Sequence, residues 1–547
     1  MTGTLYYGDN LDILRTWIKD ESIDLIYLDP PFNSKKDYNV LFKEHSGELS
    51  ESQIRAFEDS WKWDKMAQET YEYLINSSHV SANVSGSIRA MVDFLRKNDL
   101  SAYLVMMTVR LIELRRVLKP TGSIYLHCDP TASHYLKVIM DTIFGPGNFR
   151  NEIIWKKTNS PKFQSDEFGN QHDIIFFYSK TKGQNSFNKI YREPDADYLK
   201  SFRYDDQDGR GPYQTIALSN KTPLGGFGKM KEWEWRGIKS RWIYSKETMD
   251  RWYTEGKIIK TKLGYRKKYY LSESPGQIVS DIWVDNEVAP LQGLAKEKLG
   301  YPTQKPEALL ERIIQASSNK GDIVLDPFCG CGTTIHAAQK LERNWIGIDI
   351  THLAINLIKN RLFDAFRIVP EIVGEPKDLE GARQLALLDR YQFQWWALSL
   401  IGARPFNDER KKGADRGIDG IIYSPVKGSE KVYKGIVQVK SGHVDVKHIR
   451  DLIGTMEREK ADYGIYLTLE EPTGPMNKEA IEAGHFKDVF GQDVPKIQIF
   501  TIEDLLNGKK PIYPVPPDNF RTAEREKIVR SNGKDAKILD FDKEKND

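Results

Sequence analysis

Cysteine is scarce in this sequence of 547 residues, which contains only Cys128, Cys329 and Cys331. Three thiols exclude a disulfide framework, so we expect a protein of a reducing compartment, the cytoplasm. No apolar run approaches the roughly 20 residues that a membrane-spanning helix needs. The N-terminus also lacks the basic and apolar segments of a secretory signal. We therefore expect no membrane partner.

An excess of charge of either sign is also missing, because the formal net charge is only +2. The charge is unevenly distributed, however. The segment 155–281 holds 24 Lys and Arg against 16 Asp and Glu, a net charge of +8, together with several aromatic residues: Trp233, Trp235, Trp242, Trp252 and Tyr253. Basic residues interleaved with aromatics suit a nucleic-acid surface, but they equally suit a solvated charged face over an aromatic core.

Strand and helix patterns alternate over much of the chain. Apolar runs at 23–27, 123–127 and 323–325 predict strands, and the helical spacing of 333–341 followed by a strand at 345–348 completes a βαβ unit. This alternation predicts an α/β fold with a parallel sheet covered by helices on both faces. Between 156 and 290 it gives way to short strands and glycine-rich turns, which indicates a separate module.

A glycine-rich turn follows the run at 323–325 and reads Asp326-Pro327-Phe328-Cys329-Gly330-Cys331-Gly332-Thr333-Thr334. Its glycines let the backbone approach a ligand, and the helix that begins at Thr333 offers free N–H groups. Asp349 lies 23 residues after Asp326, close to the spacing of ~20 for an acidic residue that reaches ribose hydroxyls. The pattern predicts a nucleoside cofactor site, with a tight structural turn as the alternative. No cysteine and histidine cluster accompanies the turn, so zinc is not expected.

The strand at 23–27 leads into Leu28-Asp29-Pro30-Pro31-Phe32. The amino nitrogen of adenine or cytosine is a poor nucleophile because its lone pair is delocalised into the ring. Asp29 and the Pro30 carbonyl can each accept one amino hydrogen, which favours a pyramidal nitrogen, and proline fixes φ and helps to hold that carbonyl. Phe32 can stack on a base rotated out of the duplex. The motif, including Pro31, predicts methylation of an exocyclic amino group.

These motifs together resemble the β class of amino-group DNA methyltransferases that use S-adenosylmethionine; they are Asp29 to Phe32, Asp326 to Gly332, Asp349 and Thr303-Gln304-Lys305-Pro306. The resemblance covers residues 1–365. It implies a cofactor site made of Asp9, Thr303, Lys305, Asp326, Pro327, Phe328, Gly330, Gly332, Thr333 and Asp349. Within that site Asp9 would contact the adenine edge, Asp349 the ribose hydroxyls, and the Lys305 segment the methionine end. Asp at the head of the catalytic motif is more typical of adenine-N6 enzymes, and cytosine N4 stays open.

The resemblance also names the parts of the chain. We expect a Rossmann-like methyltransferase sheet formed by a catalytic part at 1–155 and a cofactor-binding part at 291–365. A target-recognition domain at 156–290 would read base edges in the major groove. A linker at 366–384, a second α/β domain at 385–510 and a disordered, charged tail at 511–547 would follow.

The second α/β pattern carries Asp419 and, about twenty residues later, Gln438 and Lys440. An Asp followed by Gln-x-Lys resembles the PD-(D/E)xK nucleases, particularly those related to type IV restriction enzymes. The resemblance implies that Asp419 holds Mg²⁺ and that Lys440 helps to orient or activate the attacking water. Gln438 departs from the usual carboxylate and binds Mg²⁺ less strongly. An active nuclease therefore stands beside a fold kept for DNA binding or self-association.

We predict a restriction-modification protein that transfers a methyl group from S-adenosylmethionine to adenine N6 in double-stranded DNA and carries a nuclease-like domain. Two other hypotheses are a DNA-binding protein with a vestigial methyltransferase fold and a methyltransferase that acts on RNA. The intact residues Asp29 to Phe32 and Asp349 argue against the first, and the long basic module argues against the second. A homodimer is a further expectation.

Overall fold

The structure is a computed structural model, and the residues that it describes are 3–31, 37–43, 49–58, 62–159, 166, 168–219, 232–262, 264–292, 295, 297, 299, 304–406, 417–426, 429, 431–517 and 526. For 37–43 and 49–58 only the backbone is described. The chain forms two compact units. One comprises Met1–Asn188 and Asp281–Asp547, and the other comprises Lys189–Ser280.

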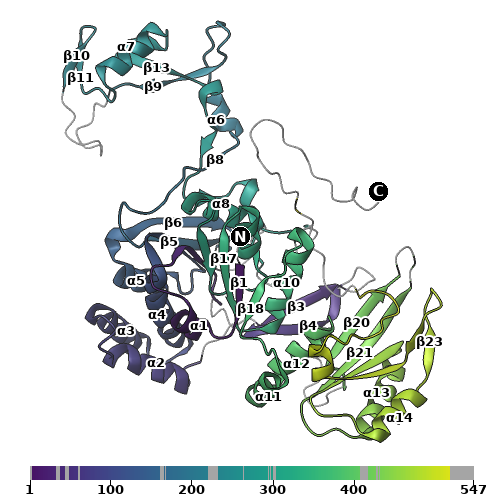
Figure 1. The fold of residues 1–547 in the computed structure, drawn as a ribbon. Helices are drawn as coiled ribbons and strands as arrows, with labels where there is room; N and C mark the ends of the chain where they lie inside the picture. The colour runs from purple at the N-terminus through teal and green to yellow at the C-terminus, as the bar shows by residue number, and fades with distance from the viewer. Residues whose placement is uncertain are drawn as a thin grey trace. The chain divides into compact units, whose positions relative to one another are not determined.

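The first unit is built around an open nine-stranded sheet (Figure 1). Its strands, from one edge to the other, are β15 (Ile282–Trp283), β6 (Phe149–Lys156), β7 (His172–Ser179), β5 (Leu118–Cys128), β2 (Ile23–Leu28), β16 (Ile323–Asp326), β17 (Asn344–Asp349), β1 (Gly3–Tyr7) and β18 (Glu371–Val373). Among these, β7 alone runs antiparallel to its neighbours. The predicted α/β fold with a Rossmann-like sheet is confirmed.

The chain changes its winding direction at the pair β2 and β16. From β1 it passes to β2 and then to β5, whereas from β16 it passes the other way, to β17. Because crossover connections are right-handed, the two halves place their helices on opposite faces. One face carries α1 (Asn10–Trp17), α4 (Asp99–Val117) and α5 (Ser133–Phe144), and the other carries α8 (Glu307–Ser317), α9 (Thr333–Lys340) and α10 (His352–Phe366) (Figure 1). In such sheets ligands bind beside the carboxyl ends of the strands at this switch point.

The largest core lies between the sheet and the helices of the first face. Helix α4 is buried on nearly all sides because α2 (Lys65–Asn76) and α3 (Ala82–Leu95) cover it from outside. Strand β2 is buried on both faces, with Leu25 and Ile26 fully inaccessible, as expected for a central parallel strand. The first unit also contains a hairpin and two short turns: β3 (Asp37–Lys43) with β4 (Leu49–Glu58), η1 (Pro146–Asn148) and η3 (Asn286–Val288).

The compact unit Lys189–Ser280 is narrower than the predicted module at 156–290, because β7 pairs with β5 and β6 inside the main sheet. Its sheet is β12 (Ile258–Thr261), β13 (Gly264–Tyr270) and β9 (Tyr213–Ala217). The other elements are β8 (Tyr191–Arg192), α6 (Ala196–Lys200), β10 (Trp233–Trp235), β11 (Ile238–Ser240), α7 (Lys246–Thr254), η2 (Leu271–Glu273) and β14 (Gln277–Ile278). Trp235 and Trp242 are buried in its core with Met249, so these rings are structural and do not form a binding surface.

The predicted linker at 366–384 is structured, because β18 pairs with β1 and α11 (Leu379–Leu388) begins within it. The domain after it has a sheet in the order β19 (Arg404–Pro405), β20 (Gly420–Pro425), β21 (Val432–Lys440), β22 (Tyr463–Thr468) and β25 (Ile497–Thr501). Its remaining elements are α12 (Arg390–Leu400), α13 (Val446–Glu459), α14 (Gly474–Glu482), β23 (His485–Lys487), β24 (Asp493–Pro495) and α15 (Ile502–Leu506). Separate cores form on its two faces, which confirms a second α/β domain. Apart from residues 511–517 and 526, the predicted tail lies outside the described residues.

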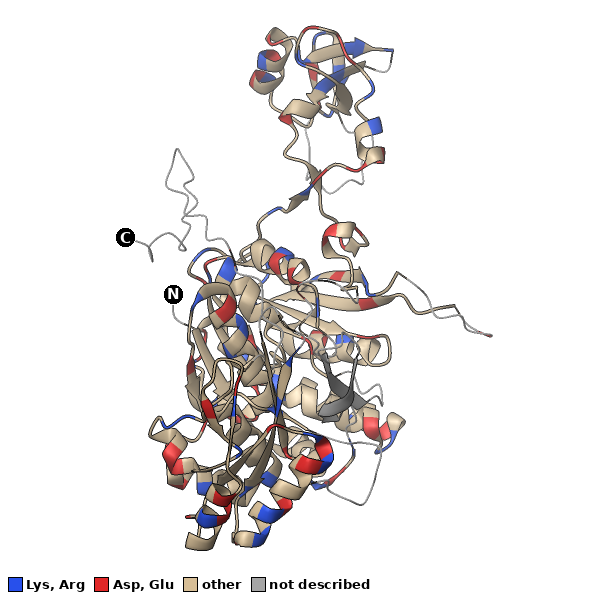
Figure 2. Cartoon of the chain, turned by 90° about the vertical axis from the view of Figure 1, so that its right-hand side faces the viewer, with Lys and Arg blue, Asp and Glu red and all other residues tan. Residues whose placement is uncertain are grey.

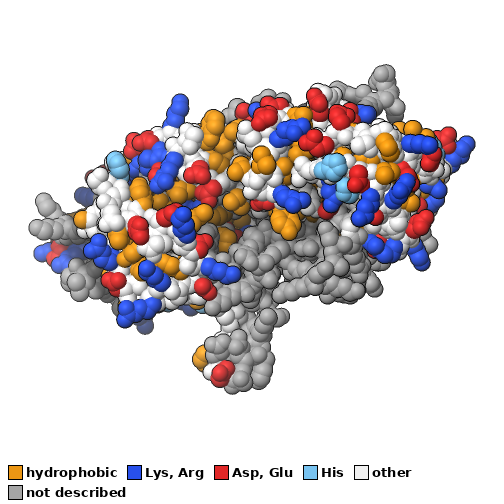
Figure 3. Space-filling model, turned by 90° about the horizontal axis from the view of Figure 1, so that it is seen from below, with side chains coloured by type: hydrophobic (Ala, Val, Ile, Leu, Met, Phe, Trp, Pro, Cys, Tyr) orange, Lys and Arg blue, Asp and Glu red, His pale blue; other side chains and the backbone are white. Residues whose placement is uncertain are grey.

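Helices capable of crossing a bilayer are absent from the described residues. The face of the chain shown in Figure 3 mixes hydrophobic side chains with Lys, Arg, Asp and Glu.

Candidate active site

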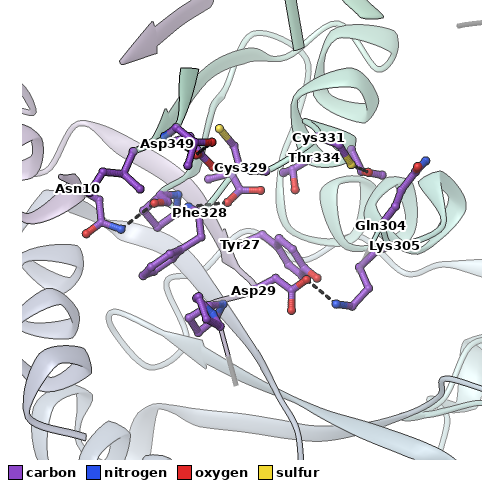
Figure 4. Close-up of a pocket in the computed structure, with 18 of the residues that line it drawn as sticks. Asn10, Tyr27, Asp29, Gln304, Lys305, Phe328, Cys329, Cys331, Thr334 and Asp349 are labelled. Carbon is purple, nitrogen blue, oxygen red and sulfur yellow. Dashed lines mark hydrogen bonds and ion pairs between the residues drawn. The ribbon is translucent and has the colours of Figure 1, made fainter. Parts of the chain in front are cut away.

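The two motifs that are 297 positions apart in sequence lie on neighbouring strands. Strand β16 pairs with β2 in parallel, with Leu325 opposite Ile26, so Asp326 and Asp29 emerge at the same edge of the sheet. Between them lies a cavity of about 280 Å³ (Figure 4). The predicted residues that line it are Asp9, Asp29, Pro30, Pro31, Lys305, Asp326, Pro327, Phe328, Gly330, Thr333 and Asp349. One space therefore serves both motifs.

Among the described residues predicted for this site, Gly332 is not in the cavity lining. The predicted residues Phe32 and Thr303 lie outside the described residues. Gly332 is the N-cap of α9 with a left-handed φ of 73°, and a Cβ there would come within 2.6 Å of Ile358 Cγ1. Its role in the structure is thus to make the turn and the close packing of α10, while the neighbouring Gly330 and Thr333 face the cavity.

Asp29 extends from the end of β2 into the cavity. Its Oδ2 forms an ion pair with Lys305 Nζ, and only 16 % of the Asp29 side chain and 10 % of the Lys305 side chain are exposed. Asp29 Oδ1 is buried and accepts no hydrogen bond from any residue that the structure describes. Figure 4 shows the two side chains pointing toward each other. One carboxylate oxygen is thus held, while the other is left as an acceptor.

Asp349 ends β17 and receives several hydrogen bonds. Gly330 N donates to its Oδ2 at 2.9 Å, while the backbone N and the hydroxyl of Thr351 donate to Oδ1, each at 2.9 Å. Desolvation raises the pKa of Asp349 to about 6, although these hydrogen bonds favour the ionised form. The carboxylate therefore ties the β16 turn to the β17 turn at the cavity wall.

Asp326 is only 3 % exposed and accepts a hydrogen bond from Phe328 N at 3.0 Å. Burial raises its pKa to about 7, and the nearby carboxylates of Asp29 and Asp349 add to that rise. Near neutral pH a large fraction of Asp326 is therefore uncharged, which suits a residue that shapes a loop better than one that balances a cation.

Sequence reasoning missed Arg110, which comes from the middle of α4 and is 4 % exposed. Its Nη2 donates to both oxygens of Asp9, at 3.1 and 2.8 Å, and its Nε donates to Asn10 Oδ1 at 2.6 Å. Asn10 Nδ2 in turn donates to Pro327 O at 2.8 Å. The guanidinium of Arg110 therefore connects helix α4 to the turn that follows β1. Through Asn10 it also connects α4 to the turn that follows β16. An isolated Arg inside an apolar helical pattern gives no sequence signal of this role.

A polar chain lies behind the catalytic motif. Tyr27 lines the cavity, and its hydroxyl lies 3.0 Å from His127 Nδ1, while His127 Nε2 lies 3.3 Å from Asp173 Oδ2. Burial alone would raise the pKa of Asp173, but hydrogen bonds with His127 and Lys157 outweigh it and lower that pKa. This buried network anchors the end of β2 and so restrains the segment that carries Asp29.

The nuclease candidates also meet in space. Asp419 lies just before β20, and its Oδ2 accepts a hydrogen bond from Val439 N at 2.7 Å, between Gln438 and Lys440 on β21. Gln438 is buried and donates to Gly417 O. Helix α12 supplies a residue that the sequence did not single out, since Gln394 Nε2 donates to Asp419 Oδ1 at 2.9 Å. The helix upstream of Asp419 thus contributes a hydrogen-bond donor to its carboxylate.

Comparison with known proteins agrees with this arrangement. Residues 23–360 match the family model described as DNA methylase, and residues 385–505 match one described as restriction endonuclease. The type II methyltransferase M.EcaI of Enterobacter cloacae is 35 % identical over 267 residues, which is 48 % of this chain and 57 % of that protein. The Mod subunit of the type III restriction-modification enzyme StyLTI of Salmonella typhimurium is 28 % identical over 365 residues, 61 % of this chain and 49 % of that protein. The chain thus spans about half the length of these curated relatives.

Solved structures give more distant matches. The M1.HpyAVI complex with SAM has 18 % identity and a TM-score of 0.30, covering 66 % of this chain and 99 % of that one. The PvuII DNA methyltransferase, described as cytosine-N4-specific, has 16 % identity and a TM-score of 0.30, covering 65 % and 85 %. The DNA methylase model itself matches 338 of the 547 residues. The chain belongs to the DNA methylase family.

Proposed function

We propose that this chain transfers a methyl group from S-adenosylmethionine to adenine N6 in double-stranded DNA, as one part of a restriction-modification protein. The observation that carries the proposal is the single cavity shared by Asp29 and the turns that follow β16 and β17. When bound, the cofactor supplies an electrophilic methyl group on a sulfonium. A labelled methyl group should pass from the cofactor to duplex DNA incubated with the wild-type chain, and absence of label would count against the proposal.

The cavity residues fit such a cofactor. Asp349 offers carboxylate oxygens for ribose hydroxyls at one wall, and Phe328 offers an apolar surface beside it. Thr333 and Thr334 at the N-terminus of α9 line the same space, and the first turn of a helix offers free N–H groups. Asp29 lines the same cavity, where Oδ1 can accept one amino hydrogen of an extruded base and Pro30 O the other. These acceptors would orient the amino lone pair toward the methyl group. The sulfur–methyl bond would break as the nitrogen–methyl bond forms, which would leave a neutral thioether, and the extra amino proton would pass to Asp29 and from there to water.

Adenine is proposed over cytosine because Asp heads the catalytic motif. The alternative, cytosine N4 together with an inactive nuclease-like DNA-binding domain, makes the same use of the cavity. Sequencing DNA from cells that express the chain, with detection of modified bases, separates the two. N6-methyladenine at one recurring motif is expected, and N4-methylcytosine would assign the alternative.

We propose that the unit Lys189–Ser280 recognises the target. It holds 19 Lys and Arg against 12 Asp and Glu, a net charge of +7, although Figure 2 shows acidic positions interspersed among the basic ones. Several cations are tied to acidic partners, such as Arg210 to Asp208 and Lys268 to Asp206. Removing this unit should abolish sequence-specific binding of duplex DNA.

We also propose a homodimer and a cytoplasmic location. Sedimentation of the full chain tests whether it forms a homodimer.

Cofactor affinity should depend on pH through Asp349. Its pKa is about 6 in the cofactor-free protein, and only the ionised carboxylate accepts hydrogen bonds on both oxygens. Affinity should therefore be full well above pH 6 and fall as the pH decreases through it, by about tenfold between pH 7 and pH 5. Equilibrium binding of S-adenosylmethionine measures this. The variant Asp349→Asn should bind roughly 10- to 100-fold more weakly at pH 8 and should lack the component centred near pH 6. An unchanged pH profile in this variant would contradict the assignment.

For the second domain we propose Mg²⁺-dependent cleavage of DNA. Asp419 contacts β21 at Val439, the residue between Gln438 and Lys440. Asp419 would hold the ion, and Lys440 would orient water. Unmethylated DNA with Mg²⁺ should be cut by the wild-type chain and about 100-fold more slowly by Asp419→Ala. The exposed Asp451 on α13 gives a matched control, whose Ala variant should cut normally. Lack of cleavage in every methylation state would favour a fold kept for DNA binding.

A further inference from the structure

The contact between Lys305 and Asp29 bears on the methylation step. Lys305 belongs to the segment expected at the methionine end of the cofactor, yet its ammonium pairs with the carboxylate of the catalytic motif, 276 residues away in sequence (Figure 4). Both side chains are largely buried and both line the cavity. This pair therefore stands inside the reaction space, at the group that must receive the target amine.

The backbone around Lys305 is fixed on both sides. Gln304 before it donates its side-chain amide to Glu297 O at 2.6 Å and accepts from Leu299 N at 2.8 Å. Glu307 after it begins α8 and pairs with Lys340 at 2.9 Å, and with Arg361 at 3.5 Å. Because both neighbours are anchored, the backbone of Lys305 is held beside the cavity, and its ammonium reaches Asp29 from there.

We propose that Lys305 is a positioning residue for Asp29. A carboxylate can rotate about its Cβ–Cγ bond and exchange its two oxygens. The ion pair holds Oδ2, so Oδ1, which is buried and unpaired within the described structure, keeps one direction toward the target amine. The ion pair at Oδ2 thus orients Oδ1 as a hydrogen-bond acceptor. The free-energy cost of orienting the Asp29 carboxylate is therefore incurred before the target base enters the cavity.

A purely structural role is the competing explanation. Buried ion pairs add little net stability, since desolvation of the two charges offsets their attraction. A pair retained only for folding would also be expected among packed elements, whereas this one borders a cavity. A second competitor is that Lys305 binds the methionine carboxylate of the cofactor. The proposal predicts a change in the rate of methyl transfer, cofactor binding predicts a change in cofactor affinity, and a purely structural role predicts a change in neither.

This inference rests on the proposed function, so the test begins with labelled methyl transfer by the wild-type chain. Three variants are then compared: Lys305→Gln, Lys305→Arg and the control Lys137→Gln. Lys137 pairs with Asp141 at 2.7 Å on α5 and does not line the cavity. Each is measured for thermal unfolding, for the dissociation constant of S-adenosylmethionine, and for the single-turnover rate on duplex DNA.

Lys305→Gln should slow the single-turnover rate roughly 100-fold, with the dissociation constant of the cofactor within threefold of the wild-type value. Lys305→Arg should recover to within tenfold of the wild-type rate because it keeps the positive charge, and this variant answers the question if the Gln variant unfolds. Lys137→Gln should match the wild type. A tenfold weaker cofactor affinity with an unchanged rate would overturn the proposal in favour of cofactor binding, and unchanged rate and affinity would leave the pair structural. Absence of transfer by the wild-type chain would instead reject the proposed function.

Discussion

Replacing Asp29 with alanine should lower the single-turnover rate of methyl transfer about 10³-fold, within the range found for positioned proton-accepting groups. Alanine removes both carboxylate oxygens, and with them the acceptor that the buried Oδ1 offers to the amine. In the view of Figure 4, Asp29 lies apart from Asp349, the residue proposed to bind the ribose, so the cofactor should still bind with a dissociation constant within threefold of the wild-type value. The effect would therefore fall on the rate constant.

The controls for this experiment follow from the same geometry. Asp29→Asn keeps one acceptor oxygen but loses the charge that Lys305 pairs with, so an intermediate rate is expected. Asp93→Ala removes an exposed carboxylate on α3 and should change nothing. Transfer by Asp29→Ala at a rate within tenfold of the wild type would show that the target amine does not depend on this carboxylate, and the mechanism would have to be abandoned.

The meeting of the two motifs could be predicted from the sequence, whereas the exact neighbours could not. Apolar runs ahead of Asp29 and Asp326 identify buried strands, and parallel strands end at a common edge. The sequence says nothing, however, about which strands pair. The register that sets Leu325 opposite Ile26 depends on the winding of the whole sheet, in which the connection from β7 to β15 alone is 102 residues long.

The residues that sequence reasoning missed share a physical cause. Arg110 and Gln394 lie on helices and act through side chains that reach other elements, so no local pattern records their role. Strand β18 was missed because three residues, Glu371–Val373, are too few to show the alternation that identifies a strand in a sequence. The tryptophans of the unit Lys189–Ser280 were ambiguous for a related reason: composition counts rings but does not say which of them, such as Trp235, are buried.

Replacing Arg110 with methionine should lower both the stability of the protein and its affinity for the cofactor. In the variant Arg110→Met the cofactor-free protein should lose about 2–3 kcal/mol of stability, because buried acceptors on Asn10 and Met106 lose their donor and Asp9 loses its charge partner. The Asp9 side chain is 36 % exposed, so water can replace part of the lost contact, which places the cost below that of a fully buried pair. Thermal unfolding should register a fall in Tm of roughly 2–4 °C, because a chain of this length has a large entropy of unfolding.

Arg15→Met is the matched control, because Arg15 pairs with Glu113 at 3.1 Å on the same pair of helices but is 39 % exposed. Exposed pairs contribute about 0–1 kcal/mol, so its Tm should stay near that of the wild type. The two variants should also differ in cofactor affinity. Arg110 holds the turn after β1, which Asn10 links to Pro327 in the turn after β16, so its loss should weaken binding, whereas the loss of Arg15 should not. Equal effects of both substitutions on Tm and affinity would mean that the buried guanidinium does not organise the cavity, and that the two turns are positioned by the sheet alone.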